Sequence, residues 1–165
     1  MLNRLCRLPA RQSCLLLGPR QTGKTTLVRA SLPGDAFSVD LLAHDSFLRY
    51  SKDPSLFRSE VEARLRAGAR TVFVDEIQKI PSLLDEIHGL IERTGARFLL
   101  TGSSARKLRR APANLLAGRA ATRRLHPLTA VEIGSDFSLP RALRFGTLPP
   151  VATSDDERAR DVLES

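Results

Sequence analysis

The stretch GPRQTGKTT at residues 18–26 decides the fold of this chain. It fits the pattern G-x-x-x-x-G-K-[ST], in which glycines let the backbone wrap closely around a phosphate group. The apolar run at residues 14–17 predicts a strand before it, and a helix is expected to begin near Lys24, which is the context that a phosphate-binding loop requires. We therefore expect nucleotide phosphates to contact the whole stretch, which consists of Gly18, Pro19, Arg20, Gln21, Thr22, Gly23, Lys24, Thr25 and Thr26.

The lysine and threonine of this motif have separate expected roles. The start of the following helix presents free N–H groups and the positive end of its dipole to an anion. Lys24 is expected to reach the β- and γ-phosphates, and the Thr25 hydroxyl is expected to bind Mg²⁺. The motif alone fits a kinase, a GTPase or an ATPase.

A second motif, TVFVDEIQKIP at residues 71–81, ends an apolar strand with two carboxylates. A carboxylate at the tip of a buried strand is costly unless a cation needs it, and Mg²⁺ opposite Thr25 would be that cation for Asp75. Glu76 can polarise a water molecule for in-line attack on the γ-phosphate. This pair favours hydrolysis, because a kinase does not need a water-activating glutamate. The alternative is a pair that only stabilises the start of a helix.

Two further motifs carry candidate catalytic residues. The stretch RFLLTGSSARKL at residues 97–108 predicts a strand that ends in hydroxyl groups, and Thr101 or Ser103 is expected to orient the attacking water or contact the γ-phosphate. The alternative is a serine that caps the next helix. In LLAGRAATRRLHPL at residues 115–128, Arg119 is a candidate for stabilising charge on the phosphoryl group, within the chain or across a subunit interface. An ordinary surface arginine is an equal alternative.

Strand and helix patterns alternate along the chain. We expect strands at 13–17, 36–41, 71–74, 97–101 and 122–125, helices at 24–32, 53–66 and 83–93, a short basic helix or arm at 3–12, and a loop with a short helix at 105–116. This alternation indicates an α/β fold with a parallel sheet and helices on both faces. Right-handed crossovers would then bring the ends of the strands, and with them Gly18, Asp75 and Thr101, to one edge of the sheet.

The composition limits the class of protein. The chain has 165 residues, of which 42% are hydrophobic and 27% charged, so a packed core is expected and global disorder is excluded. The formal net charge of +8 favours polyanions. No acidic residue occurs between Arg97 and Glu132, so the Arg97–Arg124 region is a candidate surface for DNA or a protein partner, with a solvated arginine-rich surface as the alternative.

The cysteines and the apolar runs indicate the compartment. Cys6 and Cys14 have no spacing typical of a metal site or a disulfide framework, and Cys14 is expected to be an inert core residue. The longest apolar run near the N-terminus is too short for a signal peptide or a membrane span. We therefore expect a cytoplasmic protein that does not contact a membrane.

Four stretches together resemble the successive motifs of prokaryotic AAA-family ATPases: LLLGPRQTGKTTL, VFVDEIQKIP, FLLTGSS, and LAGRA followed by LHPLTAVEI. In that family such a domain usually precedes a C-terminal domain of unknown function. The resemblance covers roughly residues 3–150, keeps the motif order and includes Gln78 and Pro81. It implies a three-layer α-β-α P-loop NTPase fold with a five-stranded, mostly parallel sheet of the additional-strand type, and an ATPase that uses ATP and Mg²⁺.

The resemblance also implies roles for single residues. Lys24 and Thr25 would form the Walker A contacts to phosphates and Mg²⁺, and Asp75 would be the Walker B metal carboxylate. Glu76 would be the catalytic base. The first sensor position would fall on Thr101 or Ser103, and Arg119 would be an arginine finger, which implies self-association.

The chain departs from that family after the fifth expected strand. No helical lid is visible there, and no second sensor arginine can be assigned. We expect residues 1–139 to form the ATPase domain with its basic arm, and residues 140–165 to form a linker and the start of a helix that leads to a C-terminal domain absent from this chain. That charged helix, from residue 154, is expected to have nothing to pack against.

ATP hydrolysis assisted by Mg²⁺ is thus the leading function, and two alternatives stay open. A small P-loop kinase or phosphotransferase fits the chain length, but it would need an acceptor pocket and a mobile lid. A nucleotide-dependent nucleic-acid-binding module would use the Arg97–Arg124 region, and its affinity for DNA would fall steeply with salt.

Overall fold

The computed structural model describes residues 3–103, 116 and 118–164. The first half of the chain forms β1 (Ser13–Leu17), α1 (Lys24–Arg29), β2 (Phe37–Asp40), α2 (His44–Lys52), α3 (Pro54–Arg66), β3 (Thr71–Asp75), the 3-10 turn η1 (Ile77–Lys79) and α4 (Leu83–Thr94). The second half forms β4 (Arg97–Gly102), β5 (Ala120–Arg124), α6 (Ala130–Ile133), the 3-10 turn η3 (Gly134–Asp136), α7 (Leu139–Phe145), α8 (Pro149–Ala152) and α9 (Asp156–Glu164). Apart from Leu116, the loop and short helix expected at 105–116 lie outside the described residues.

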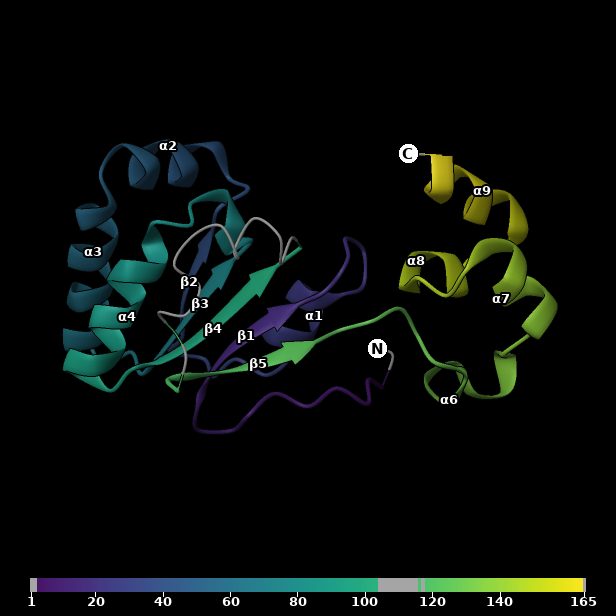
Figure 1. The fold of residues 1–165 in the computed structure, drawn as a ribbon, viewed down its shortest axis with the longest axis horizontal. Helices are drawn as coiled ribbons and strands as arrows, with labels where there is room; N and C mark the ends of the chain where they lie inside the picture. The colour runs from purple at the N-terminus through teal and green to yellow at the C-terminus, as the bar shows by residue number, and fades with distance from the viewer. Residues whose placement is uncertain (1–2, 104–115, 117, 165) are drawn as a thin grey trace.

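The five strands form one sheet in the order β2-β3-β4-β1-β5 (Figure 1). Every pairing is parallel, and β4 lies between the strand before the P-loop and the strand that ends in Asp75. This inserted strand confirms the expected additional-strand type of P-loop fold. Leu17 pairs with Gly102, and Asp40 pairs with Asp75, so the carboxyl ends of the strands share one edge.

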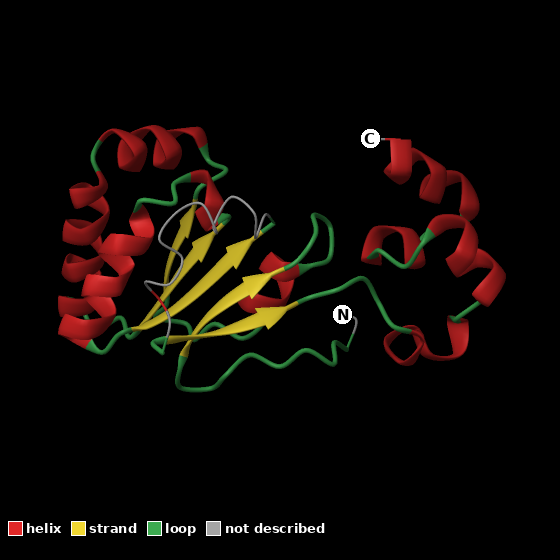
Figure 2. Ribbon diagram, viewed as in Figure 1, coloured by secondary structure: helices red, strands yellow, loops and turns green. Residues whose placement is uncertain are grey.

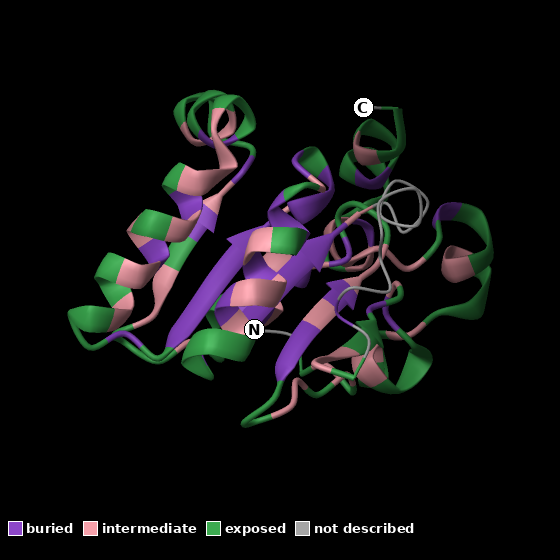
Figure 3. Cartoon of the chain, turned by 60° about the vertical axis from the view of Figure 1, so that its left-hand side comes forward, coloured by how far each residue is buried: buried purple, intermediate pink, exposed green. Residues whose placement is uncertain are grey.

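The central strands β1, β3 and β4 are largely buried on both faces, as their continuous apolar sequences predict, whereas the edge strand β5 is mostly exposed. Val72 and Val74 belong to the larger core cluster, which packs against α3 and α4. Phe73 lies between them in the sequence and belongs to the second cluster on the opposite face, together with Val28 of α1. Adjacent residues of a strand thus pack into clusters on opposite faces of the sheet. Helices cover each face (Figures 2 and 3).

Helix α2 was not expected from the sequence, because nothing local marks its start. Ala43 occupies the N-cap position and offers no side-chain acceptor. Tertiary packing holds the helix instead: Tyr50 is buried edge-on against Phe57 of α3, with ring centroids 5.5 Å apart. Helix α3 begins where it was expected, and the Asp53 side chain accepts a hydrogen bond from Ser55 N–H at 2.9 Å.

Residues 3–12 form an arm without regular secondary structure, which is the second of the two forms expected for them. Cys6 and Leu8 pack against the second core cluster, which contains Val28 of α1. The Arg97 guanidinium donates a hydrogen bond to the Pro9 carbonyl at 2.6 Å. The arm therefore closes the α1 face of the sheet. Cys14 in that cluster is 1% exposed, and burial raises the pKa of its thiol to about 11, so it is the inert core residue that was expected.

Residues 140–165 do not form the expected linker with an unsupported helix. Helices α7, α8 and α9 pack on one another around a small core of Phe145, Val151 and Ala159. Pro140 lies in the first turn of α7, and Pro149 and Pro150 lie in the first turn of α8, where the helix has no hydrogen bond for a backbone N–H to lose. The segment after β5 is therefore helical, although no lid was visible in the sequence.

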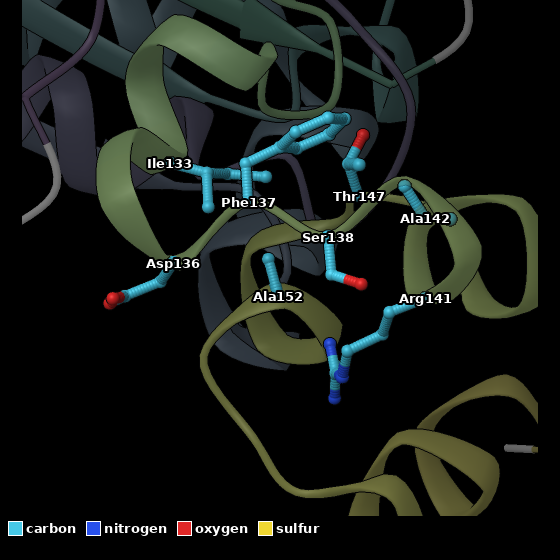
Figure 4. A pocket seen from close by; sticks show the side chains of 9 residues that line it. Ile133, Asp136, Phe137, Ser138, Arg141, Ala142, Thr147 and Ala152 are labelled. Carbon is cyan, nitrogen blue, oxygen red and sulfur yellow. The ribbon is translucent and has the colours of Figure 1, made fainter.

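A small cavity lies among these helices and is lined by Ile133, Phe137, Arg141 and their neighbours (Figure 4). Its volume of about 20 Å³ is close to that of a single water molecule, so it is a packing gap and not a ligand site. Arg141 donates hydrogen bonds to the Val151 carbonyl at 3.1 Å and the Ser154 carbonyl at 2.6 Å, which ties α7 to the end of α8. Within the described ranges, no helix is both long and apolar enough to cross a membrane.

Candidate functional site

The loop between β1 and α1 is held in place by the strands on both sides of β1. Gly18 N–H donates to the Gly102 carbonyl of β4 at 3.2 Å, and Leu125 N–H donates to the Leu17 carbonyl at 2.7 Å. A Cβ atom on Gly18 would lie 2.1 Å from the Leu125 carbonyl oxygen. The first glycine of the motif is therefore required by the close approach of the chain after β5, in addition to any contact with phosphate.

The rest of the loop curls over the start of α1. Gln21 and Gly23 have positive φ angles of 63° and 84°, which let the backbone turn tightly before the helix. The Thr22 hydroxyl donates to the Pro19 carbonyl at 2.9 Å, and Lys24 Nζ donates to the same carbonyl at 2.8 Å. The loop thus forms a cradle that is closed by its own hydrogen bonds. Pro19, Arg20, Gln21 and Thr26 are exposed, whereas Thr22 and Lys24 are buried.

An open cavity of about 400 Å³ lies over this cradle. Arg20, Lys24 and Thr25 from the P-loop line it together with Leu42 and Glu76. Burial lowers the pKa of Lys24, while the nearby carboxylates of Glu76 and Asp75 oppose that shift. A buried ammonium group gains stability from an anion, so the electrostatics of the cavity favour a phosphate group beside Lys24.

Thr25 and Asp75 meet at the carboxyl edge of the sheet. The Thr25 hydroxyl lies 2.8 Å from Asp75 Oδ2 and 3.0 Å from Oδ1. Asp75 is 3% exposed and also accepts a hydrogen bond from the Thr101 hydroxyl. A hydroxyl and a carboxylate are hard oxygen donors of the kind that Mg²⁺ prefers, and phosphate oxygens and water normally complete its coordination. These two residues therefore fit a magnesium ion.

Glu76 occupies a strained turn directly after β3. Its φ and ψ angles are 58° and 46°, in the left-handed region that non-glycine residues rarely adopt. Its N–H donates to Thr101 Oγ1 at 3.0 Å, and its Oε2 accepts hydrogen bonds from Gln78 Nε2 and, at 2.7 Å, from the Ser103 hydroxyl. Its other oxygen lies 3.9 Å from Lys24 Nζ. The carboxylate is thus fixed at the mouth of the P-loop.

Thr101 and Ser103 have different surroundings, although the sequence offered them as alternatives for one role. Thr101 is fully buried, and its hydroxyl bridges the Asp75 side chain and the Glu76 backbone. Ser103 is partly exposed and bonds to the Glu76 carboxylate. Thr101 is therefore an internal support of Asp75 and Glu76, whereas Ser103 is the more exposed of the two, and the sensor role of either residue stays a prediction.

Gln78 belongs to the site but was not among the predicted site residues. Its side chain is largely buried, and it bonds to Glu76 and to both the hydroxyl and the N–H of Ser103. A buried amide two residues after a carboxylate pair is the signal that could have identified it, because such an amide needs partners.

Within one chain, Arg119 does not lie beside the P-loop or beside Asp75 and Glu76. It precedes Ala120, which pairs with Ser13 at the opposite end of β1 from the P-loop. Its guanidinium donates to the Glu92 carboxylate of α4 through Nε at 2.9 Å and through one terminal nitrogen. A role for Arg119 within its own site is therefore not supported, and a role across a subunit interface stays a prediction.

The arginines of the Arg97–Arg124 region that the structure describes lie at separate places on the sheet. Arg97 lies at the amino end of β4 beside the arm, whereas Arg123 and Arg124 lie at the carboxyl end of β5. The basic residues of this region at 106–110 lie outside the described residues. Arg123 and Arg124 line an open groove of about 470 Å³ together with Arg7 and His126.

The sequence profile of the AAA domain family matches residues 10–134 of the chain. An uncharacterized protein of Mycobacterium tuberculosis, Rv2008c, is 35% identical over 145 residues, which cover 85% of this chain and 30% of that protein. This chain therefore spans 30% of the length of that relative.

Solved structures share the fold at low sequence identity. Caenorhabditis elegans PCH-2 superposes with a TM-score of 0.52 at 18% identity, over 82% of this chain and 40% of that one. The ORC1 protein of Aeropyrum pernix, solved in complex with DNA, superposes with a TM-score of 0.54 at 16% identity, over 92% of this chain and 52% of that one. At these identities the likeness concerns the fold alone.

Proposed function

Because the chain belongs to the AAA domain family, we propose that it binds ATP and hydrolyses it in a reaction that depends on Mg²⁺. One observation supports this most strongly: the Glu76 carboxylate is fixed beside Lys24 by Gln78 and Ser103. A protein that only binds a nucleotide needs the P-loop. It does not need a carboxylate that is held beside Lys24 in a strained turn. Backbone strain of this kind concentrates at functional sites.

In this proposal the P-loop residues bind and orient the phosphates. The N–H groups of the loop and the start of α1 face the anion, and Lys24 exchanges its bond to the Pro19 carbonyl for a phosphate oxygen. Thr25 and Asp75 would hold Mg²⁺, which, when bound, neutralises developing charge on the phosphate oxygens. Thr101 keeps Asp75 in place from behind.

Glu76 is the proposed general base. It accepts a proton from the water molecule that attacks the γ-phosphate, and a residue in this role typically contributes about 10²- to 10⁴-fold to the rate. Ser103 and Gln78 set the orientation of its carboxylate, since both donate to the same oxygen and leave the other oxygen facing Lys24. Ser103 is also the proposed sensor of the γ-phosphate.

The test is calorimetric binding of ATP with Mg²⁺, together with an assay of phosphate release. Lys24→Ala should abolish binding or nearly so, because it removes the buried cation of the cradle. Arg29→Ala is the matched control, since it removes an exposed cation from the end of the same helix and should leave ATP affinity unchanged. An unchanged affinity in Lys24→Ala would refute the phosphate role. Phosphate transfer to an acceptor in place of release would favour the kinase alternative.

We also propose that hydrolysis requires a neighbouring copy of the chain, which supplies Arg119. The position of Arg119 at the far edge of its own sheet supports a role toward a neighbour over one within the chain. The rate per chain should then rise with protein concentration and fall in Arg119→Ala. A concentration-independent rate would exclude this role.

Binding of DNA is a second candidate function. The specific observation in its favour is the groove lined by Arg7, Arg123 and Arg124. Among the described residues that line it, the single carboxylate is Glu132, which is already paired with Arg4. The ORC1 protein with the same fold was solved with DNA. Affinity for a DNA duplex should fall steeply between 50 and 200 mM salt. A flat salt dependence would exclude it.

A further inference from the structure

Arg4 joins three segments that lie far apart in the sequence. Its Nε donates to Glu132 Oε1 of α6 at 3.0 Å, and one terminal nitrogen donates to the Thr22 carbonyl of the P-loop at 3.1 Å. The other terminal nitrogen donates to the His126 carbonyl, just after β5. The three donors of one planar group thus serve three acceptors, a set that the flexible ammonium of a lysine could not reproduce.

The two oxygens of the Glu132 carboxylate bind different segments of the chain. Its Oε2 accepts from the N–H of Thr129 at 2.9 Å and completes the capping box of α6. Its Oε1 accepts from Arg4 and from the N–H of Leu5 at 2.8 Å. The same side chain therefore starts α6 and anchors the N-terminal arm, whose end lies beside the connection from β5 to α6 (Figure 1).

The side chains of this ion pair are less exposed than those of the other pairs of the C-terminal helices. The side chains of Arg4 and Glu132 are 9% and 4% exposed, whereas those of Arg141 and Asp156 are 25% and 51% exposed. Exposed pairs contribute little to stability, but the loss of one partner from a buried pair is strongly unfavourable. We therefore expect separation of Arg4 from Glu132 to be costly, and the two residues to move together.

The contacts continue into the C-terminal helices. Leu128 N–H, between β5 and α6, donates to the Thr147 carbonyl between α7 and α8 at 2.8 Å. The path from the P-loop to these helices therefore runs from the Thr22 carbonyl through Arg4 and Glu132 to α6, and from there through the connection at Leu128.

We propose that Arg4 is a positioning residue that couples the conformation of the P-loop to the position of α6 and the helices that follow it. The inference rests on the proposed function only for the identity of the ligand that reaches the P-loop. A nucleotide that displaces the backbone at Thr22 would shift Arg4. Through Glu132, this shift would reach the C-terminal helices. Coupling is reciprocal, so a change at Glu132 must also alter the P-loop.

The first experiment follows hydrogen exchange of backbone amides in the nucleotide-free chain. Glu132→Gln keeps the shape and an acceptor oxygen but removes the charge, and Arg4→Lys keeps the charge but loses the three-way geometry. Each should raise exchange in the P-loop, residues 18–27, by about fivefold or more. The double variant should show no more exchange there than either single variant, because both remove one shared link. Asp156→Asn is the control, since it breaks an exposed pair in the same helices and should leave the P-loop unchanged.

Exchange in residues 18–27 that stays at the wild-type level in Glu132→Gln would overturn the proposal. So would additive effects in the double variant, which would show two independent structural roles. A second measurement adds ATP and Mg²⁺ to the wild-type chain: exchange at residues 129–133 should slow, and this protection should be lost in Glu132→Gln. Binding of ATP without that protection would also overturn the coupling. A wild-type chain that binds no ATP refutes the proposed function instead, and the nucleotide-free comparison still decides the role of Arg4.

Discussion

The side chain of Gln78 and residue Ser103 bind each other twice: Gln78 Nε2 donates to Ser103 Oγ at 3.0 Å, and Gln78 Oε1 accepts from Ser103 N–H at 3.2 Å. Both residues also donate to the same oxygen of Glu76. The ends of β3 and β4 are thereby locked together around one carboxylate. Neither residue alone fixes the orientation of Glu76, and the pair does so only because β4 lies beside β3 in the sheet.

This arrangement predicts the effect of Gln78→Leu, which keeps a similar side-chain size and removes every polar contact. Glu76 should lose one donor and Ser103 should lose both of its contacts to Gln78. We expect kcat for ATP hydrolysis to fall about 10- to 100-fold, in the range seen when a residue that orients a catalytic ligand is lost. KM for ATP should change little, because the cradle is untouched. Steady-state kinetics measure both, and Gln12→Leu on the exposed arm is the control. A large rise in KM with unchanged kcat would contradict the orienting role.

The close approach between Gly18 and Leu125 predicts a difference in stability between two glycine variants. In Gly18→Ala the new Cβ would lie 2.1 Å from a backbone oxygen that cannot move without β5, so the free energy of unfolding should fall by about 1–3 kcal/mol. In Gly34→Ala no atom lies within 4 Å of the new Cβ, and the change should stay within about 0.5 kcal/mol. Urea denaturation of both variants makes the comparison. Equal stability of the two would contradict a steric requirement for glycine at position 18.

Glu132 predicts a pH dependence of stability. Burial alone would raise the pKa of Glu132, but the N–H groups of Thr129 and Leu5 and the charge of Arg4 lower it below its ordinary value. A carboxylate with a lowered pKa in the folded chain contributes stability above its unfolded pKa of about 4.3, and this contribution is lost as the pH falls through the folded pKa. Glu132→Gln should therefore be less stable than wild type by about 1–3 kcal/mol at pH 7.

The difference between the two chains should shrink as the pH falls below about 4, because protonation of the wild-type carboxylate mimics the variant. Urea denaturation at a series of pH values measures it. A difference that stays constant down to pH 3 would show that the charge of Glu132 does not stabilise the fold.

The sheet and the P-loop could be predicted from the sequence because both depend on local patterns. The apolar run at 71–74 is typical of a strand buried on both faces, and the glycine spacing of 18–23 is typical of a phosphate-binding loop. Helix α2 was missed because its stability comes from Tyr50 against Phe57 and not from a cap. The C-terminal helices α7 and α8 were missed because they are short, with seven and four residues, and are held by packing around Phe145, Val151 and Ala159.

Within the site, the sequence named the residues that would contact a nucleotide but could not assign those that position them. Thr101 and Ser103 are close neighbours in the sequence, but Thr101 lies within β4 and bonds to Asp75, whereas Ser103 follows the end of β4 and bonds to the Glu76 carboxylate. Arg4 and Gln78 act through partners at distant positions, and such pairs arise from topology. Hydrogen bonds between residues that are distant in the sequence produce no periodic pattern from which they could be predicted.

The central claim is that Glu76 activates the attacking water, and Glu76→Gln tests it most directly. Binding of ATP with Mg²⁺ and single-turnover release of phosphate should be measured on wild type, on Glu76→Gln and on Glu62→Gln, which changes a partly exposed glutamate of α3 away from the site. We predict that Glu76→Gln binds ATP about as tightly as wild type and releases phosphate at least about 100-fold more slowly. Phosphate release by Glu76→Gln at the wild-type rate would contradict the account.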